Sequence, residues 1–264
     1  SAKLAYGANG DSKKGINVLS PPSIDFTAVS KNISNIIAKI APHDSADRFR
    51  SLGVTVIEQY AKFSGRKQIS STDISVQFRY AVIASGTRPF IPPIPGLAET
   101  PFLTNETIFS LTDLPQHLAI IGAGAIGVEL AQAFRRLGAH VSLIESNYIL
   151  ANEDDEIVAK LRDILCDEGI KLFEQTQVTK TSHDNGGISI ETSQGQIQAS
   201  HLLVATGRKA NIDQLGLDIA GVKSSPQKIL TDDRLRTSNK NIFAIGDIAG
   251  QMQLTNVASA HASV

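Results

Sequence analysis

Apolar residues recur at helical spacing in two early segments of the chain. Between Asp25 and Ile40 they fall three or four positions apart, which predicts an amphipathic helix. Ser23 or Asp25 is the expected N-cap of this helix. A shorter helix is predicted from Ser45 to Leu52, because a glycine follows it as a stop signal.

Short apolar runs with the pattern of β-strands come next. Val54–Ile57, the residues around 74–78 and Tyr80–Ala84 are the first three predicted strands. A proline-rich segment, 90–96, follows them, and its prolines are incompatible with a helix or a sheet interior. We therefore expect this segment to be an extended connection between two domains.

From position 117 onward, apolar strands alternate with helical patterns. Runs at 117–121, 141–144, 202–205 and 241–245 are typical of strands that are buried on both faces. Helices are predicted at 128–137 and 154–167, and short strands with turn signals lie between the second helix and position 202. This alternation indicates an α/β fold.

Composition limits the classes of function. Lysine plus arginine number 25 against 26 aspartates plus glutamates, and this balance argues against a protein that grips nucleic acid or an acidic membrane surface. No apolar run approaches the ~20 residues that span a bilayer, so a soluble, cytoplasmic protein is expected. The single cysteine, Cys166, excludes an intramolecular disulfide and is expected to be a core residue. The six histidines lack metal-ligand spacing, so no metal site is expected.

One segment combines glycines, a strand and a helix in a pattern that carries chemistry. Gly122-x-Gly124-x-x-Gly127 follows the strand 117–121 and precedes a helix. Gly122 would allow the tight turn, Gly124 would let a pyrophosphate approach the backbone, and Gly127 would let the helix pack closely. The helix N-terminus would offer free N–H groups to the phosphates. The pattern predicts a dinucleotide-binding site; a nucleotide-free fold that keeps its glycines for packing is the alternative.

An acidic residue at the end of the next strand bears on which nucleotide binds. Glu145 lies where a carboxylate accepts hydrogen bonds from a ribose diol. A 2′-phosphate would meet its charge, and the residues that follow, Ser146, Asn147 and Tyr148, include no cation. We therefore expect NAD(H) rather than NADP(H).

Four segments resemble one enzyme family. Ala119–Ala131 looks like the NAD segment of the FAD-dependent pyridine nucleotide–disulfide oxidoreductases. Residues 80–86 with 94–96, residues 203–208 with Asn211, and residues 236–238 with 242–247 resemble further family motifs in the same order, the last being the second FAD motif. Two branches are similar: the glycine-rich segment resembles lipoamide dehydrogenases, whereas 40–49 and 103–111 resemble the mercuric-reductase-like branch.

The resemblance implies roles for particular residues. Glu129 would pair with a lysine near the flavin and help to orient hydride transfer, which makes it the catalytic candidate. Asp247 would accept a hydrogen bond from the ribityl chain of FAD. The implied NAD contacts are Gly122, Ala123, Gly124, Ala125, Ile126, Gly127, Glu129, Glu145, Val178 and Gly207. The implied FAD contacts are Ala61, Ser85, Gly86, Thr87, Asp247, Gln253, Leu254, Thr255 and Asn256.

The resemblance also implies a domain plan. It is an α/β fold with a Rossmann-like NAD-binding domain, 114–236, inserted in an incomplete FAD-binding domain formed by 1–113 and 237–264. The redox cysteine pair and the C-terminal acid–base pair of the family have no counterpart in these 264 residues. We therefore expect a fragment of a flavoprotein that passes hydride between NAD(P)H and FAD and on to a disulfide, dithiol or metal-ion acceptor.

Two expectations for binding and activity follow from this plan. The chain alone is expected to bind NADH, to hold FAD weakly or not at all, and to be inactive, whereas its full-length parent would be a homodimer. A stand-alone NAD(H)-binding module without catalysis is the alternative. In either case the expected partners are small nucleotide cofactors, not nucleic acid or a membrane.

Overall fold

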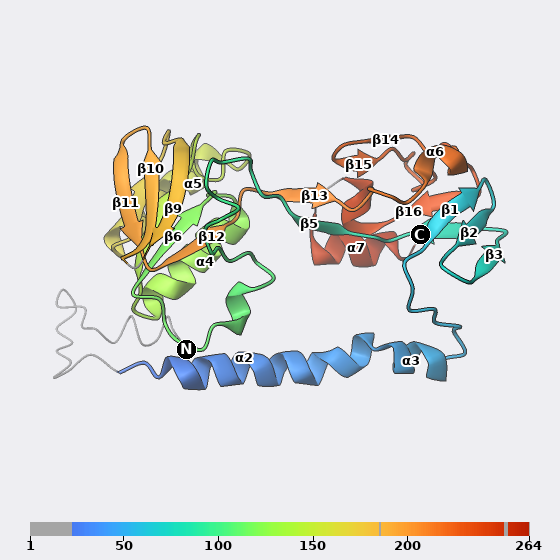
Figure 1. Ribbon diagram of the computed structural model, residues 1–264, viewed down its shortest axis with the longest axis horizontal. Helices are drawn as coiled ribbons and strands as arrows, with labels where there is room; N and C mark the ends of the chain where they lie inside the picture. Colours follow the sequence, from blue (N-terminus) through green and yellow to red (C-terminus); the bar gives the residue numbers. More distant parts are fainter. Residues whose placement is uncertain (1–22, 185, 251–252, 264) are drawn as a thin grey trace. The chain divides into compact units, whose positions relative to one another are not determined.

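The computed structural model describes residues 23–184, 186–250 and 253–263, and the chain folds as two compact units (Figure 1). The first unit comprises the described residues up to His43 together with Pro89–Gly207. The second comprises Asp44–Arg88 and the described residues from Arg208 onward. The chain thus passes between the units at 43/44, at 88/89, just before the predicted proline-rich connection, and again at 207/208.

The unit boundaries differ from the predicted domain boundaries at 113/114 and 236/237. Leu97 and Ile108, placed in the FAD domain by the sequence, are each 1% exposed and lie in cores of the first unit. Ile229, placed in the NAD domain, shares a core with Ile242 in the second unit. Shared buried apolar surface, rather than the positions of motifs, decides which residues fold together. Which cofactor each predicted domain binds stays a prediction.

A four-stranded parallel sheet forms the centre of the first unit. Its order is β12-β6-β7-β8, and every neighbouring pair is parallel. The strands are β12 His201–Val204, β6 His117–Ile121, β7 His140–Ile144 and β8 Lys171–Phe173. Strands β6, β7 and β12 confirm the runs that the sequence predicted, and the parallel sheet confirms the α/β class.

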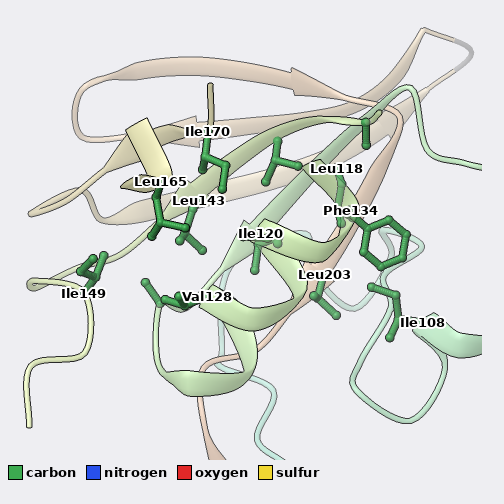
Figure 2. Close-up of a cluster of buried hydrophobic side chains, with 14 of the residues drawn as sticks. Ile108, Leu118, Ile120, Val128, Phe134, Leu143, Ile149, Leu165, Ile170 and Leu203 are labelled. Carbon is green, nitrogen blue, oxygen red and sulfur yellow. The ribbon is translucent and has the colours of Figure 1, made fainter. Parts of the chain in front are cut away.

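The two faces of this sheet are covered by different layers. On one face, α4 (Ala125–Arg136) and α5 (Asp155–Asp167) pack against alternate strand residues such as Leu118 and Ile120, as Figure 2 shows. On the other face, Ala119 and Ile121 join a core with an antiparallel sheet of order β11-β10-β9. Those strands are β9 Val178–Asp184, β10 Gly187–Thr192 and β11 Gly195–Ala199. The parallel strands are therefore buried on both sides, which explains their continuous apolar runs.

The two helices that cover the sheet begin at identifiable caps. The Asp154 carboxylate accepts hydrogen bonds from the N–H groups of Glu156 and Ile157, so α5 starts where the sequence predicted. Helix α4 starts at Ala125, earlier than the predicted 128, because Gly124 is its N-cap. Cys166 is exposed, so the prediction of a core cysteine is wrong. Leu165 occupies the buried face of α5, and the next residue is turned away from it.

The early helices form as predicted, but one apolar face is not buried. Helix α2 (Phe26–Ile40) has Asp25 as its N-cap, and its first residue packs on Phe134 with ring centroids 6.1 Å apart. Ile36, Ile37 and Ile40 are each about half exposed. A 3₁₀ turn, η2 (Ala41–Asp44), and α3 (Ala46–Ser51) follow. Within the described ranges, no helix combines the length and the apolar content that crossing a bilayer requires.

Short strands and turns build the second unit. Strand β4 (Ala81–Ile83) pairs in parallel with β16 (Ile242–Ala244), and β1-β2-β3 form a separate antiparallel sheet. The described elements not yet given include one in the first unit, η3 Ile108–Ser110. The others are β1 Lys62–Gly65, β2 Gln68–Ser70, β3 Ser75–Gln77, β5 Thr87–Pro89, β13 Arg208–Ala210, α6 Leu217–Ala220, β14 Ser224–Ser225, β15 Lys228–Ile229, η4 Gly246–Ala249 and α7 Thr255–His261.

The strand predicted at Val54–Ile57 does not form. The segment is irregular, and Val54 and Ile57 are 49% and 41% exposed. No strand in the described part of the chain pairs with it. Because a strand is stabilised by a neighbour's hydrogen bonds and packing, β-propensity alone does not fix this segment as a strand.

Candidate nucleotide-binding site

Two glycines bring the turn after β6 into very close contact with its surroundings. Gly122 has φ +101°, and a Cβ there would lie 2.5 Å from the carbonyl oxygen of Ala205. A Cβ on Gly127 would lie 2.0 Å from the carbonyl oxygen of Gly122. Any larger residue would clash with backbone atoms at either position. Gly127 therefore lets α4 pack tightly on the turn, as the sequence predicted.

Backbone crowding does not explain why the middle position of the motif is a glycine. Gly124 has φ −71°, which any residue adopts, and a Cβ there would meet nothing within 4 Å. It is the N-cap of α4 without a side-chain cap, and the first helical hydrogen bond to it comes from the N–H of Val128. The N–H groups of the first turn therefore face open space at the positive end of the helix. This arrangement fits a phosphate group.

Residues 122–124 are here called the glycine turn. Glu145 lies beside this turn, at the carboxyl end of β7. Its Oε2 accepts a hydrogen bond from the N–H of Ala123 at 2.8 Å. Its Oε1 accepts hydrogen bonds from the N–H of Asn147 at 2.9 Å and from the Ser146 hydroxyl at 3.1 Å. Each carboxylate oxygen has two lone pairs, so Oε2 keeps the capacity to accept from a ligand hydroxyl.

Two pockets of the first unit meet at this carboxylate. The smaller, about 290 Å³, lies at the ends of β6 and β7, and Gly122, Glu145 and Val178 are among its lining residues. The larger, about 400 Å³, is lined by residues 123–125, by Glu145 and by residues 147–153 other than Ile149. No lysine or arginine is among the described residues that line either pocket.

The structure brings together most of the residues predicted to contact NAD, but not all of them. Gly122, Ala123, Gly124, Ala125, Glu145 and Val178 line the two pockets. Gly127 is buried beneath them, whereas Ile126 and Glu129 are on α4 outside the pocket lining, and Glu129 is exposed. Gly207 is exposed beyond the end of β12. The sequence analysis missed Thr176, Gln177 and Thr206 of the smaller pocket. Thr206 could have been found, because it follows a parallel strand and ligands of open α/β sheets bind at the carboxyl ends of the strands.

The residues predicted to contact FAD lie in the second unit. Ser85 and Asn211 are joined reciprocally: the Ser85 hydroxyl donates to the carbonyl of Asn211, and the Asn211 side chain donates to the carbonyl of Ser85, both at 2.9 Å. The carbonyl of Gly86 accepts the N–H of Asn211 at 3.0 Å. Ala61 and Ser85 line a pocket of about 710 Å³ together with Asp213. Hydrogen bonds from Arg88 and Lys209 hold the pKa of Asp213 below its usual value.

An arginine that the sequence did not single out is tied to Asp247. The Thr87 hydroxyl donates to Asp247 Oδ2 at 2.8 Å and accepts from Arg208 Nε at 2.6 Å. Arg208 also lies 3.7 Å from Asp247 Oδ2 as an ion pair. Only the fold could reveal this group, because its members are far apart in the chain.

Four further predicted FAD contacts, Gln253, Leu254, Thr255 and Asn256, are exposed at the start of α7. A nearby histidine has a structural contact: His261 Nδ1 accepts the N–H of Gly246 at 3.1 Å. No group of three or more possible metal ligands occurs among the residues that the structure describes.

Comparisons with known proteins agree with the resemblance seen in the sequence. The model of the family "Pyridine nucleotide-disulphide oxidoreductase" matches residues 9–262. A mercuric reductase of Streptomyces lividans is 32% identical over 275 residues, which is all of this chain and 58% of that protein. A mercuric reductase of Shewanella putrefaciens is 35% identical over 216 residues, covering 80% of this chain and 39% of that protein.

A solved structure shows the same fold. The Cu(II) complex of the HOCl-induced flavoprotein disulfide reductase RclA from Escherichia coli matches with a TM-score of 0.85 at 25% identity, covering 98% of this chain and 58% of that one. The chain thus spans between about two fifths and three fifths of the length of these relatives. With a family match over nearly its whole length, the chain belongs to the pyridine nucleotide–disulphide oxidoreductases, a family that uses FAD and a nicotinamide nucleotide.

Proposed function

We propose that this chain provides the NAD(H)-binding site of a flavoprotein that passes hydride between NAD(H) and FAD, and electrons on to a disulfide, dithiol or metal-ion acceptor. The observation that carries the proposal is the open space over Gly124 at the N-terminus of α4, with the Glu145 carboxylate on the adjacent strand. The relatives, mercuric reductases and a flavoprotein disulfide reductase, support the acceptor classes.

The residues of the first unit fit a dinucleotide. The free N–H groups of α4 would bind the pyrophosphate, and Glu145 would accept the hydrogen bonds of the adenosine ribose. Apolar residues of the smaller pocket, such as Ile121 and Val178, would contact the base. When bound, the nucleotide would supply the hydride. Glu129, exposed on α4, would orient the nicotinamide end, as the resemblance implies.

Pocket charge supports NAD(H) over NADP(H). Glu145 and Glu153 line the larger pocket, and none of its described lining residues is cationic. A 2′-phosphate on the ribose would meet the Glu145 carboxylate without a compensating charge. Like charges placed together at a binding site cost several kcal/mol, which is enough to select the nucleotide without the phosphate.

The second unit fits a role toward FAD. Asp247 Oδ2 is occupied by the Thr87 hydroxyl, whereas no described group donates a hydrogen bond to Oδ1. That oxygen would accept a hydrogen bond from a ribityl hydroxyl. The Thr87–Arg208 pair would hold the carboxylate in place.

Anaerobic mixing of the flavin-loaded protein that contains this chain with NADH or NADPH tests the proposal. We expect NADH to bleach the flavin absorbance at a lower concentration than NADPH. Replacing Glu145 with alanine should raise the NADH concentration needed. NADH binding without flavin reduction would favour the stand-alone nucleotide-binding module, and no binding of either nucleotide would refute both functions.

A further inference from the structure

A short irregular segment forms one wall of the larger pocket. Residues 146–153, here called the β7 loop, follow Glu145, and six of them line that pocket. Leu150 in this loop has φ +47°, a left-handed conformation that L-residues rarely adopt. Such a conformation persists only where the surroundings hold it. The loop must therefore be anchored by specific contacts.

Besides the bond from the N–H of Asn147 to Glu145, three hydrogen bonds anchor the backbone of the loop to other segments. The N–H of Leu150 donates to the carbonyl of Ala123 at 3.0 Å, and the carbonyl of Asn147 accepts the N–H of Gln175 at 2.8 Å. The third bond is to a side chain, because the N–H of Ile149 donates to Oε1 of Glu174 at 2.9 Å. Ile149 itself is 1% exposed and packs in the helix-side core (Figure 2).

Glu174 is held by more than the loop. Arg162 on α5 donates to both of its carboxylate oxygens, Nε to Oε2 and Nη2 to Oε1, each at 2.9 Å. Burial would raise the pKa of Glu174, but the bonds from Arg162 and the N–H of Ile149 outweigh it and lower the pKa. The carboxylate is thus ionised, oriented on both oxygens and only 19% exposed.

The anchored loop is continuous with the glycine turn. Leu150, whose N–H binds the carbonyl of Ala123, is the residue next to Ile149. The N–H of Ala123 is bound by Glu145. Both hydrogen-bonding groups of Ala123, in the middle of the glycine turn, are therefore fixed from the strand end and from the β7 loop.

We propose that Glu174 is a positioning residue for the nucleotide site: by accepting the N–H of Ile149 it fixes the β7 loop, and through Leu150 it fixes the glycine turn. The inference rests on the proposed nucleotide-binding function. The side chain of Glu174 lines neither pocket, so its carboxylate would act on binding through the loop that it anchors.

The chain offers a matched control for this ion pair. Glu168 is also a mostly buried carboxylate that accepts two bonds from one arginine, Arg136, and its side chain is 10% exposed. It joins the C-terminal ends of α4 and α5, and its side-chain hydrogen bonds go to Gln132 and Arg136 rather than to the β7 loop. Loss of Glu168 should therefore lower stability without reaching the pocket.

Calorimetric titration of NADH into the Glu174→Ala and Glu168→Ala variants tests the proposal. We expect both variants to unfold at lower temperature, with NADH affinity falling roughly tenfold in Glu174→Ala and less than about twofold in Glu168→Ala. Amide hydrogen exchange at Ile149 should speed up only in Glu174→Ala. Equal effects of the two substitutions on NADH affinity, or an unchanged Ile149 exchange rate, would overturn the proposal.

Two double variants separate loop anchoring from charge pairing. Arg162→Met with Glu174→Gln removes both charges but keeps an oxygen that accepts the N–H of Ile149, so we expect near-normal NADH affinity. Arg162→Met with Glu174→Leu removes the acceptor as well, and its affinity should fall to that of Glu174→Ala. If the two double variants bind NADH equally, Glu174 has no anchoring role. Failure of the unaltered chain to bind NADH would instead refute the proposed function, and the Ile149 exchange rate would still test the anchor.

Discussion

At the scale of single residues, the glycines of one motif act for different physical reasons. Gly122 and Gly127 are required because a Cβ would meet backbone atoms at 2.5 Å and 2.0 Å. Gly124 instead leaves open space over the first turn of α4. The first two glycines therefore serve packing, whereas Gly124 serves binding in the proposed function, and substitutions can separate the two roles.

Gly124→Asp should abolish nucleotide binding while the fold stays intact. Aspartate is a favourable N-cap, so we expect the free energy of unfolding to change by no more than about 0.5 kcal/mol. Its side chain would fill the open space with negative charge and repel the pyrophosphate, which predicts a loss of NADH affinity of at least ~10-fold. Gly127→Ala should instead act mainly on stability, lowering the free energy of unfolding by roughly 1–3 kcal/mol through overpacking. Chemical denaturation and NADH titration of both variants would measure this contrast, and a common phenotype would contradict it.

Glu145→Ala should weaken NADH binding by about 1.5–3 kcal/mol, the usual contribution of a hydrogen bond to a charged group. Because the charge that disfavours a 2′-phosphate is also removed, affinity for NADPH should fall less or rise. Calorimetry with both nucleotides measures the two changes. Glu191→Ala, an exposed acid on β10, is the control and should leave both affinities unchanged. Unchanged NADH affinity in Glu145→Ala would remove Glu145 as the ribose ligand.

At the scale of elements, the sequence predicted what local pattern and capping determine. Helices α2, α3 and α5 and the parallel strands β6, β7 and β12 form at or close to their predicted positions. The strand predicted at 54–57 does not form, because a strand needs a partner strand, and the local sequence does not specify one. Leu150 with φ +47° and the Glu174 anchor gave no sequence signal, because both depend on contacts between segments far apart in the chain.

The amino edge of the parallel sheet should make the first unit sensitive to acid. Burial lowers the pKa of His117 and of His201, and the charges of His140 and Lys171 lower that of His117 further. The unfolded chain, with histidine pKa near 6.5, then binds more protons than the folded unit. Stability should be constant above that value and fall as pH drops below it.

Urea unfolding of the first unit across this pH range measures the effect. His117→Gln with His201→Gln should flatten the pH dependence between about pH 5 and 7. His183→Gln, an exposed position on β9, serves as the control. A steep loss of stability below pH 6.5 that survives in the double variant would contradict the assignment.

At the scale of the whole molecule, the sequence identified the family, whereas the folding units divide at other positions than the predicted domains. The family match over 9–262 confirms the resemblance that the motifs indicated. The unit boundaries at 43/44, 88/89 and 207/208 depend on which side chains share a core, as Leu97 and Ile229 show for the last two. The homodimer and the cytoplasmic location that the sequence suggested stay predictions.

Nucleotide binding should protect the first unit selectively. A ligand at 100 times its Kd adds about 2.7 kcal/mol of stability to the state that binds it. With saturating NADH, hydrogen exchange should slow in the glycine turn and the β7 loop, and stay unchanged in β1–β3 of the second unit. Protection in β1–β3 with none at 122–128 would place the nucleotide elsewhere.

The central claim is that the glycine turn and Glu145 form a site selective for NAD(H). Calorimetric titration of NADH and of NADPH into the unaltered chain tests it most directly. The account predicts one site per chain for NADH, with affinity at least ~10-fold higher than for NADPH. Absence of binding heat with NADH, or tighter binding of NADPH, would contradict it.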